Sequence, residues 1–239
     1  IRDRWRRRAP TKPVKLPTIT YQNIIEGFLP LTRNLSKCFP PVSNKVLVDI
    51  QVIDGAPLPF IVDWEEGLVK ALDKEAFRRK FVEKEIPGGT YLWLERLGGQ
   101  RYRLFPKPSC SEQRVPCKIA DWDEEGKLFF AIEEVPMRWE GDPHMFKAEL
   151  RHVNPEALFR EAEELGWSIF DAMYYTFPEL AKLDPNGKVY HTDLFNAVFF
   201  KHRMCSPRSI QAELYHRPCF VSLGDGYWKF DPSQGIKPK

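Results

Sequence analysis

The sequence contains no apolar run of about 20 residues, the length needed to cross a bilayer, and no signal peptide is visible. We therefore expect no membrane partner. The first residue is Ile and not Met, which we take to indicate a trimmed chain or one piece of a longer protein.

Cysteine is scarce, and its spacing does not suggest pairing. The chain has five cysteines, an odd number: Cys38, Cys110, Cys117, Cys205 and Cys219. This pattern fits reduced thiols better than a disulfide framework, so we expect a reducing compartment, cytoplasmic or nuclear. The gap between Cys110 and Cys117 is not a usual zinc spacing, and we interpret the cysteines as small buried or half-buried hydrophobes.

The common catalytic motifs are also missing. The chain lacks the Gly-rich phosphate loop, Gly-x-Ser-x-Gly and His-Glu-x-x-His, and its five histidines are scattered. In "DWDEEGK", the residues Asp121, Glu125 and Lys127 would suit a metal-dependent nuclease, but a Glu-x-Lys is expected by chance in a charged chain. We therefore expect no catalytic residue, metal or cofactor, and keep the nuclease as a second alternative.

Charge is low overall but uneven along the chain. The net charge is +3, yet residues 1–15 hold seven Arg or Lys and one Asp. Residues 188–239 hold eight Arg or Lys and four Asp or Glu. The two ends thus carry +6 and +4, and the middle carries −7. Two basic ends around an acidic middle favour localised contacts with a polyanion. The alternative for "RDRWRRR" is a solvated tail or a linker.

The 239 residues, 43% of them apolar, suffice for two small domains with their own cores. We expect a basic arm and Pro-rich linker over residues 1–18, followed by a β-barrel-like domain over 19–145. Apolar and polar residues alternate in "VLVDIQVI", "LPFIVDW" follows a turn, and two hairpins turn at "GGQ" and "DEEG". Closure of such short strands into a barrel would hide the sheet edges.

Two other segments complete this first domain. "KEAFRRKFVEKEI" predicts one inserted helix, and "YQNIIEGFLPLTRNLSKCFPP" predicts a strand followed by a short helical turn. Arg96, Arg101 and Arg103 gather at the "GGQ" hairpin, interleaved with Tyr91, Trp93 and Tyr102. This mixture fits base stacking with phosphate contacts. It also fits a two-faced sheet with inward aromatics and outward charges, which we favour.

Residues 150–239 are expected to form a helical segment that ends in a winged helix. "NPEALFREAEELG" begins with an Asn cap and ends at Gly166, "SIFDAMYYTFPEL" is helical until Pro178, and "HTDLFNAVFFKHR" has Thr192 or Asp193 as a cap. Ser206 and Pro207 then start another helix, on which Ile210 and Leu214 face the core. "CFVSL" and "YWKFD" flank "GDG" as a hairpin.

The stretch "VYHTDLFNAVFFKHRMCSPRSIQAELYHRPCFVSLGDGYWKFD" resembles a winged helix of the HARE-type helix-turn-helix group. The likeness lies in a helix that opens on Ser-Pro and leads to Leu-Tyr, an apolar "FV", a Gly turn and an aromatic strand. It covers about residues 188–232 and implies an association with DNA-acting proteins. The first domain, with "LPLTRNL" and "IPGGTYLWLER", resembles the B3-like pseudobarrels in architecture only.

We therefore expect an α+β protein that is a non-catalytic DNA-binding module of a larger DNA-processing or regulatory protein or complex. Duplex DNA is the expected partner, ahead of single strands, and a helix of this kind suits the major groove. The alternative is a protein-interaction scaffold using winged helix and barrel. The residues expected to contact nucleic acid are Arg4, Arg6, Arg7, Arg8, Arg203, Ser206, Arg208, Ser209, Gln211, Tyr215, Arg217 and Lys229.

Overall fold

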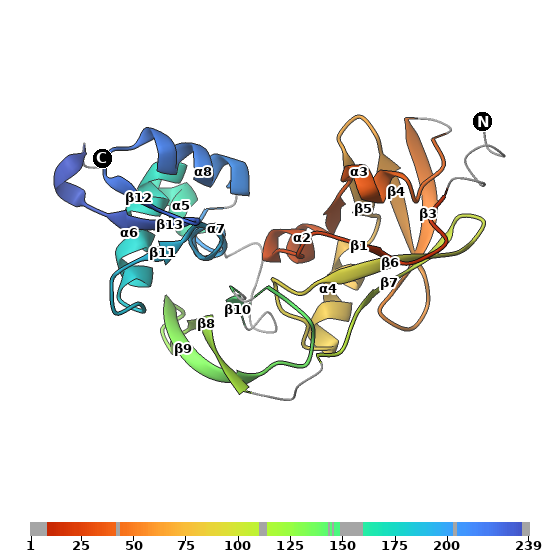
Figure 1. Cartoon of the computed structure of the whole chain (residues 1–239), viewed down its shortest axis with the longest axis horizontal. Helices are drawn as coiled ribbons and strands as arrows, with labels where there is room; N and C mark the ends of the chain where they lie inside the picture. Colours follow the sequence, from red (N-terminus) through yellow and green to blue (C-terminus); the bar gives the residue numbers. More distant parts are fainter. Residues whose placement is uncertain are drawn as a thin grey trace. The chain divides into compact units, whose positions relative to one another are not determined.

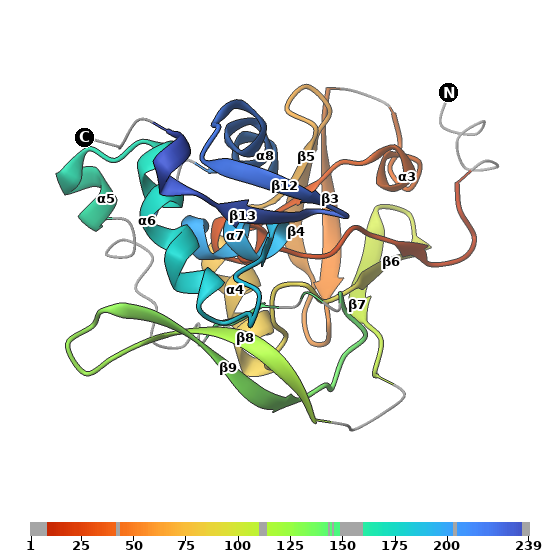
Figure 2. The same cartoon turned by 60° about the vertical axis from the view of Figure 1, so that its left-hand side comes forward.

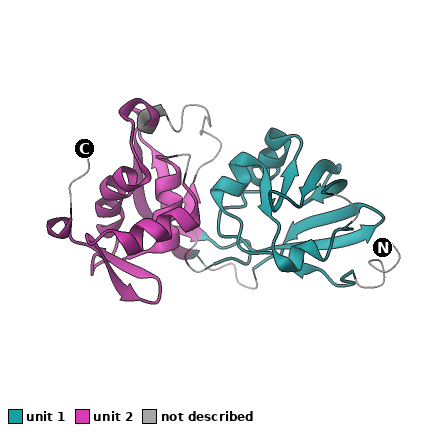
Figure 3. Cartoon of the chain, turned by 90° about the horizontal axis from the view of Figure 1, so that it is seen from above, with its two compact units in different colours: residues 1–114, 136–143 teal, residues 115–135, 144–239 magenta. Residues whose placement is uncertain are grey.

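A computed structural model of the chain divides into two compact units (Figure 3). The first contains Ile1–Arg114 and Pro136–Pro143, and the second contains Val115–Val135 and His144–Lys239. The structure describes residues 9–41, 44–109, 114–142, 144, 146–148, 160–202 and 205–235.

The first unit is built on a curled seven-stranded mixed sheet (Figure 1). The strands, in their order across the sheet, are β1 (Val14–Lys15), β6 (Leu92–Gly98), β7 (Arg101–Pro106), β3 (Lys45–Val52), β4 (Leu58–Asp63), β5 (Leu68–Ala71) and β2 (Phe28–Pro30). All neighbouring pairs are antiparallel except β3 and β7, which are parallel. Because β1 and β2 are edge strands, the sheet is barrel-like but open.

Period-2 alternation places one face of this sheet in the core. In β3, the buried side chains are Val46, Val48, Ile50 and Val52. Helix α4 (Lys74–Glu83) covers that core, and its Phe77 ring lies 5.7 Å from the ring of Phe60 on β4. The predicted inserted helix and the predicted "GGQ" hairpin are both confirmed.

The segment before β3 contains a strand followed by a short helical turn, as predicted, but a helix that was not predicted precedes them. It begins with helix α2 (Tyr21–Glu26), then β2, then the short helix α3 (Arg33–Ser36). The physical reason is a capping box: the Thr20 hydroxyl accepts from the Asn23 backbone N–H, and the Asn23 side chain accepts from the Thr20 N–H.

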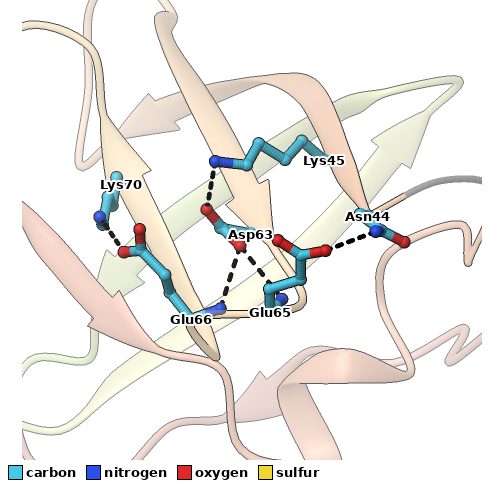
Figure 4. Close-up of polar contacts among 6 residues, drawn as sticks. All are labelled: Asn44, Lys45, Asp63, Glu65, Glu66 and Lys70. Atoms are coloured by element: carbon cyan, nitrogen blue, oxygen red, sulfur yellow. Dashed lines mark hydrogen bonds and ion pairs between the residues drawn. The ribbon is translucent and has the colours of Figure 1, made fainter.

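The turn between β4 and β5 is organised by one carboxylate (Figure 4). Asp63 is 2% exposed, and its Oδ1 accepts from the backbone N–H groups of Glu65 and Glu66 at 3.1 and 3.0 Å. Its Oδ2 lies 2.9 Å from Lys45 Nζ on β3. The hydrogen bond from Glu66 and the Lys45 ammonium lower the pKa of Asp63. Glu66 pairs in turn with Lys70.

The second unit begins with a three-stranded sheet ordered β10-β8-β9. The strands are β8 (Arg114–Trp122), β9 (Leu128–Pro136) and β10 (Phe146–Ala148), with β10 parallel to β8. The prediction assigned this "DEEG" hairpin to the barrel-like domain, whereas in the structure residues 115–135 belong to the second compact unit, with the helices. The cause is side-chain contact: Lys118 Nζ lies 2.7 Å from Asp193 Oδ2, and the Trp122 and Phe200 rings are 5.9 Å apart.

The remainder of the second unit alternates helices with a small antiparallel sheet (Figure 2). The elements are α5 (Arg160–Leu165), α6 (Ile169–Ala181), β11 (Val189–Tyr190), α7 (His191–Phe199), α8 (Pro207–His216), β12 (Phe220–Gly224) and β13 (Tyr227–Phe230). The sheet order is β11-β13-β12, with β12 at an edge. Aromatic rings of α6 contact rings of this sheet. The ring centres of Phe177 and Phe220 are 5.5 Å apart, and those of Tyr174 and Phe230 are 4.9 Å apart.

Two helix boundaries in this unit differ from the predictions. Pro178 lies inside α6, which continues to Ala181; because only the last turn follows it, little of the hydrogen-bond ladder is lost. Helix α7 begins after Tyr190, which makes no side-chain cap, and Asp193 instead pairs with Lys118 in the interior. The predicted Asn154 cap lies outside the described residues, but α5 ends at Leu165, directly before Gly166, where φ is 62°.

The cysteines of the described segments are free thiols: Cys38, Cys117, Cys205 and Cys219. All four are buried, as the sequence predicts, and Cys110 lies outside the description. Burial raises the pKa of Cys205 to about 12 and that of Cys38 to about 11, so both stay protonated at neutral pH. Within the same segments, no helix has both the length and the apolar character needed to cross a membrane.

Candidate nucleic-acid interface

Helix α8 starts at a complete capping box. The Ser206 hydroxyl accepts from the Ser209 backbone N–H at 3.1 Å, the Ser209 hydroxyl accepts from the Ser206 N–H at 2.7 Å, and Pro207 occupies the first turn. Ile210 and Leu214 are buried, at 0% and 1% exposure, as their spacing predicts. The two serines of the expected contact set therefore have a defined structural role at the helix start.

The opposite side of α8 is exposed and polar. Arg208, Gln211 and Tyr215 are exposed and lie at helical spacing of three and four residues, so they share one face. Tyr215 is 74% exposed, and its ring meets that of Trp228 edge-on at 5.0 Å. The structure thus brings three residues of the expected contact set to one outward face.

Charge on the rest of the helix is internally balanced. Glu213 is the one acid in the α8 sequence, and its Oε2 accepts from Arg217 Nε at 2.7 Å. The Arg217 guanidinium also lies 4.4 Å from the centre of the Phe170 ring of α6. These contacts neutralise the only carboxylate of the helix. Arg217, another expected contact residue, is therefore engaged in contacts within the protein itself.

The hairpin beside α8 is a tight turn with a basic strand. Gly224, Asp225 and Gly226 all have positive φ, and a Cβ on Gly226 would approach Tyr190 to 2.6 Å, so glycine is required there. Lys229 on β13 is exposed and pairs in register with Val221. Lys188 was not among the expected contact residues; its Nζ lies 4.6 Å from the centre of the ring of Tyr227, the residue that directly follows the turn.

Edge strand β12 adds an apolar surface that the sequence analysis also did not single out. Val221 and Leu223 are 43% and 49% exposed. Phe220, the first residue of β12, is buried, whereas the four residues after it are exposed.

The remaining expected contact residues are Arg4, Arg6, Arg7, Arg8 and Arg203. They lie outside the described residues, so their role stays a prediction.

The "DWDEEGK" segment forms the turn between β8 and β9. Asp123 Oδ1 accepts from the backbone N–H groups of Glu125 and Lys127 at 3.1 and 2.8 Å, which is an ordinary use of Asp in a turn. Asp121 Oδ1 accepts from the Trp122 N–H at 2.8 Å. Over the described ranges, no group of three or more His, Cys, Asp or Glu side chains is placed to hold a metal ion.

Comparison with protein-family models, with curated proteins and with solved structures found no match for this chain.

Proposed function

We propose that the chain is a non-catalytic DNA-binding module whose C-terminal part is a winged helix. In this proposal α8 is the recognition helix and the β12–β13 hairpin is the wing. Support comes from the element order, in which α6, β11, α7 and α8 precede the hairpin, and from the pairing of β11 with β13. The module would belong to a larger DNA-processing or regulatory protein or complex.

One observation supports this function most strongly: the exposed face of α8. It presents Arg208, Gln211 and Tyr215 without a carboxylate, while the opposite face is anchored by Ile210 and Leu214. Arg pairs with the acceptor edge of guanine, and Gln pairs with adenine, in the major groove. Lys229 on the wing would contact phosphate and so set the register of the helix.

A salt-dependent titration tests the proposal. Because α8 is the proposed duplex-binding element, the full chain should bind a duplex more tightly than α8 binds the matching single strand. The slope of log K against log salt should be about −0.9 for each phosphate contacted. Duplex binding that is absent, or that does not respond to salt, would contradict the proposal.

A second candidate function is a protein-interaction scaffold, favoured by Val221 and Leu223 on edge strand β12. An exposed apolar edge can accept a strand from another protein. Replacing both residues by Thr would keep strand propensity and remove apolar surface. Under the DNA proposal this double change leaves duplex affinity nearly unaltered, whereas a scaffold would lose its partner.

A further inference from the structure

The outward face of β1, β6 and β7 in the first unit carries cations stacked on aromatic rings. We define this cation–aromatic face by six residues: Lys15, Tyr91, Trp93, Arg103, Phe105 and Lys107. Strand register places them together, because Lys15 pairs with Trp93 and Trp93 pairs with Phe105. Tyr91, Arg103 and Lys107 lie two residues from Trp93 or Phe105 along the chain, with Tyr91 directly before β6 and Lys107 directly after β7, and so project to the same side.

The stacking distances are short. Lys15 Nζ lies 3.4 Å from the centre of the Tyr91 ring and 5.6 Å from that of Trp93. Lys107 Nζ lies 4.3 Å from the centre of the Trp93 ring. On the neighbouring strand, the Arg103 guanidinium lies 4.5 Å from the centre of the Phe105 ring. All are within the range of cation–π attraction, which holds the charges in place over the sheet.

Two of these cations lack a carboxylate partner within the part of the chain that is described. Lys15 and Lys107 are exposed, and their ammonium groups lie over aromatic rings, whereas the Arg103 guanidinium lies 3.7 Å from the Glu95 carboxylate. The contrast within the same unit is clear, since three other lysines, Lys45, Lys70 and Lys84, each pair with a carboxylate. The face therefore presents two ordered positive charges, Lys15 and Lys107, that pair with no carboxylate in the described part of the unit.

We propose that the cation–aromatic face binds a single-stranded nucleic acid. Its ammonium and guanidinium groups would contact successive phosphates, and the half-buried rings of Tyr91 and Phe105 would stack on bases. A single strand fits better than a duplex, because a duplex hides the faces of its bases and leaves exposed rings without a partner. Trp93, only 8% exposed, is covered by the two lysines and serves to hold them. The proposal is independent of duplex recognition by α8.

The test uses the full chain and a labelled oligothymidylate of about 15 nucleotides. Lys15→Gln with Lys107→Gln keeps the side-chain stems and removes the two unpaired charges. Fluorescence anisotropy should show affinity falling about tenfold or more. The slope of log K against log salt should become shallower by about 1.4, because each lost single-strand phosphate contact removes about 0.7.

Two control variants make the result specific. Lys74→Gln with Arg79→Gln removes the same charge from exposed positions on α4 and should leave affinity and slope unchanged. Lys15→Arg with Lys107→Arg keeps the charge and should retain binding. Duplex affinity of the Gln pair should stay within about twofold, which separates this face from α8. The proposal is overturned if the wild-type chain does not bind the oligonucleotide, if the Gln pair binds it as tightly as wild type, or if the α4 pair weakens it equally.

Discussion

Arg208 and Leu214 lie on opposite faces of α8, so replacing each of them separates binding from folding. Arg208 is exposed, and Arg208→Ala should change the free energy of unfolding by under about 0.5 kcal/mol. Leu214 is 1% exposed, and Leu214→Ala should cost about 2–5 kcal/mol because a cavity remains under the helix. Denaturant unfolding of both variants measures this contrast; equal costs would show that α8 is not oriented as described.

At the same scale, Asp63 makes the first unit sensitive to acid. Its pKa is lowered by the Glu66 N–H and by Lys45, so its stabilisation is present above the unfolded pKa of about 4 and is lost as pH falls through the lower folded value. Asp63→Asn should therefore lower Tm at pH 7, and the difference from wild type should shrink towards pH 2. Glu83→Gln, an exposed carboxyl on α4, is the control. A difference independent of pH would contradict this role.

At the scale of the element, the start of α8 depends on Ser206. The capping box satisfies two backbone N–H groups, so Ser206→Ala should cost about 0.5–2 kcal/mol of unfolding free energy. Fraying of the first turn would also displace Arg208, so duplex affinity should fall with stability. Ser233→Ala, another serine near a turn but distant in sequence from α8, serves as the comparison and should leave duplex binding unchanged. Loss of stability without any loss of affinity would mean that Arg208 does not contact DNA.

Local signals predicted elements well where the determining contacts are close in sequence. Ser206 with Pro207, the Ile210–Leu214 spacing and the "GDG" turn gave α8 and its hairpin, and "GGQ" gave the β6–β7 hairpin. In the segment that begins at Tyr21 the expected strand and helical turn are present as β2 and α3, but helix α2 was missed, although the Thr20–Asn23 capping box that starts it is also a local signal.

Long-range contacts could not be predicted in the same way. Lys118 and Asp193 are 75 residues apart, and this pair joins the β8–β9 hairpin to the helical unit. Arg103, Tyr91 and Trp93 were recognised in the sequence, but Lys15 reaches Trp93 only through pairing of β1 with β6, so its part in the cation–aromatic face could not be predicted. Arg96 and Tyr102 form one cross-strand pair on the inner side, where Tyr102 is 1% exposed. Arg96, Arg101 and Arg103 are therefore divided between the two faces of the sheet. Alternation along one strand does not predict which residues of the next strand lie beside it.

In the whole molecule, the chain passes between the two compact units more than once, and the β8–β9 hairpin belongs to the second unit. Lys118→Ala would deprive Asp193, which is 1% exposed, of its ammonium partner. Because Lys118 is itself a quarter exposed, we expect a cost of about 1–3 kcal/mol, less than for a fully buried pair. Lys127→Ala at the turn of the same hairpin should cost little. Thermal unfolding of both variants measures this, and equal effects would show that the ion pair does not join hairpin to helices.

We propose above that the outward face of α8, together with the β12–β13 hairpin, binds duplex DNA. The most direct measurement is the duplex affinity of the full chain carrying Arg208→Ala, Gln211→Ala and Lys229→Ala, at two salt concentrations. All three side chains are exposed, so the fold should be retained. We predict a loss of about 1–3 kcal/mol of binding free energy for each bidentate base contact removed, and a salt slope shallower by about 0.9 for the lost Lys229 phosphate contact. A folded triple variant with wild-type affinity and slope would contradict the claim.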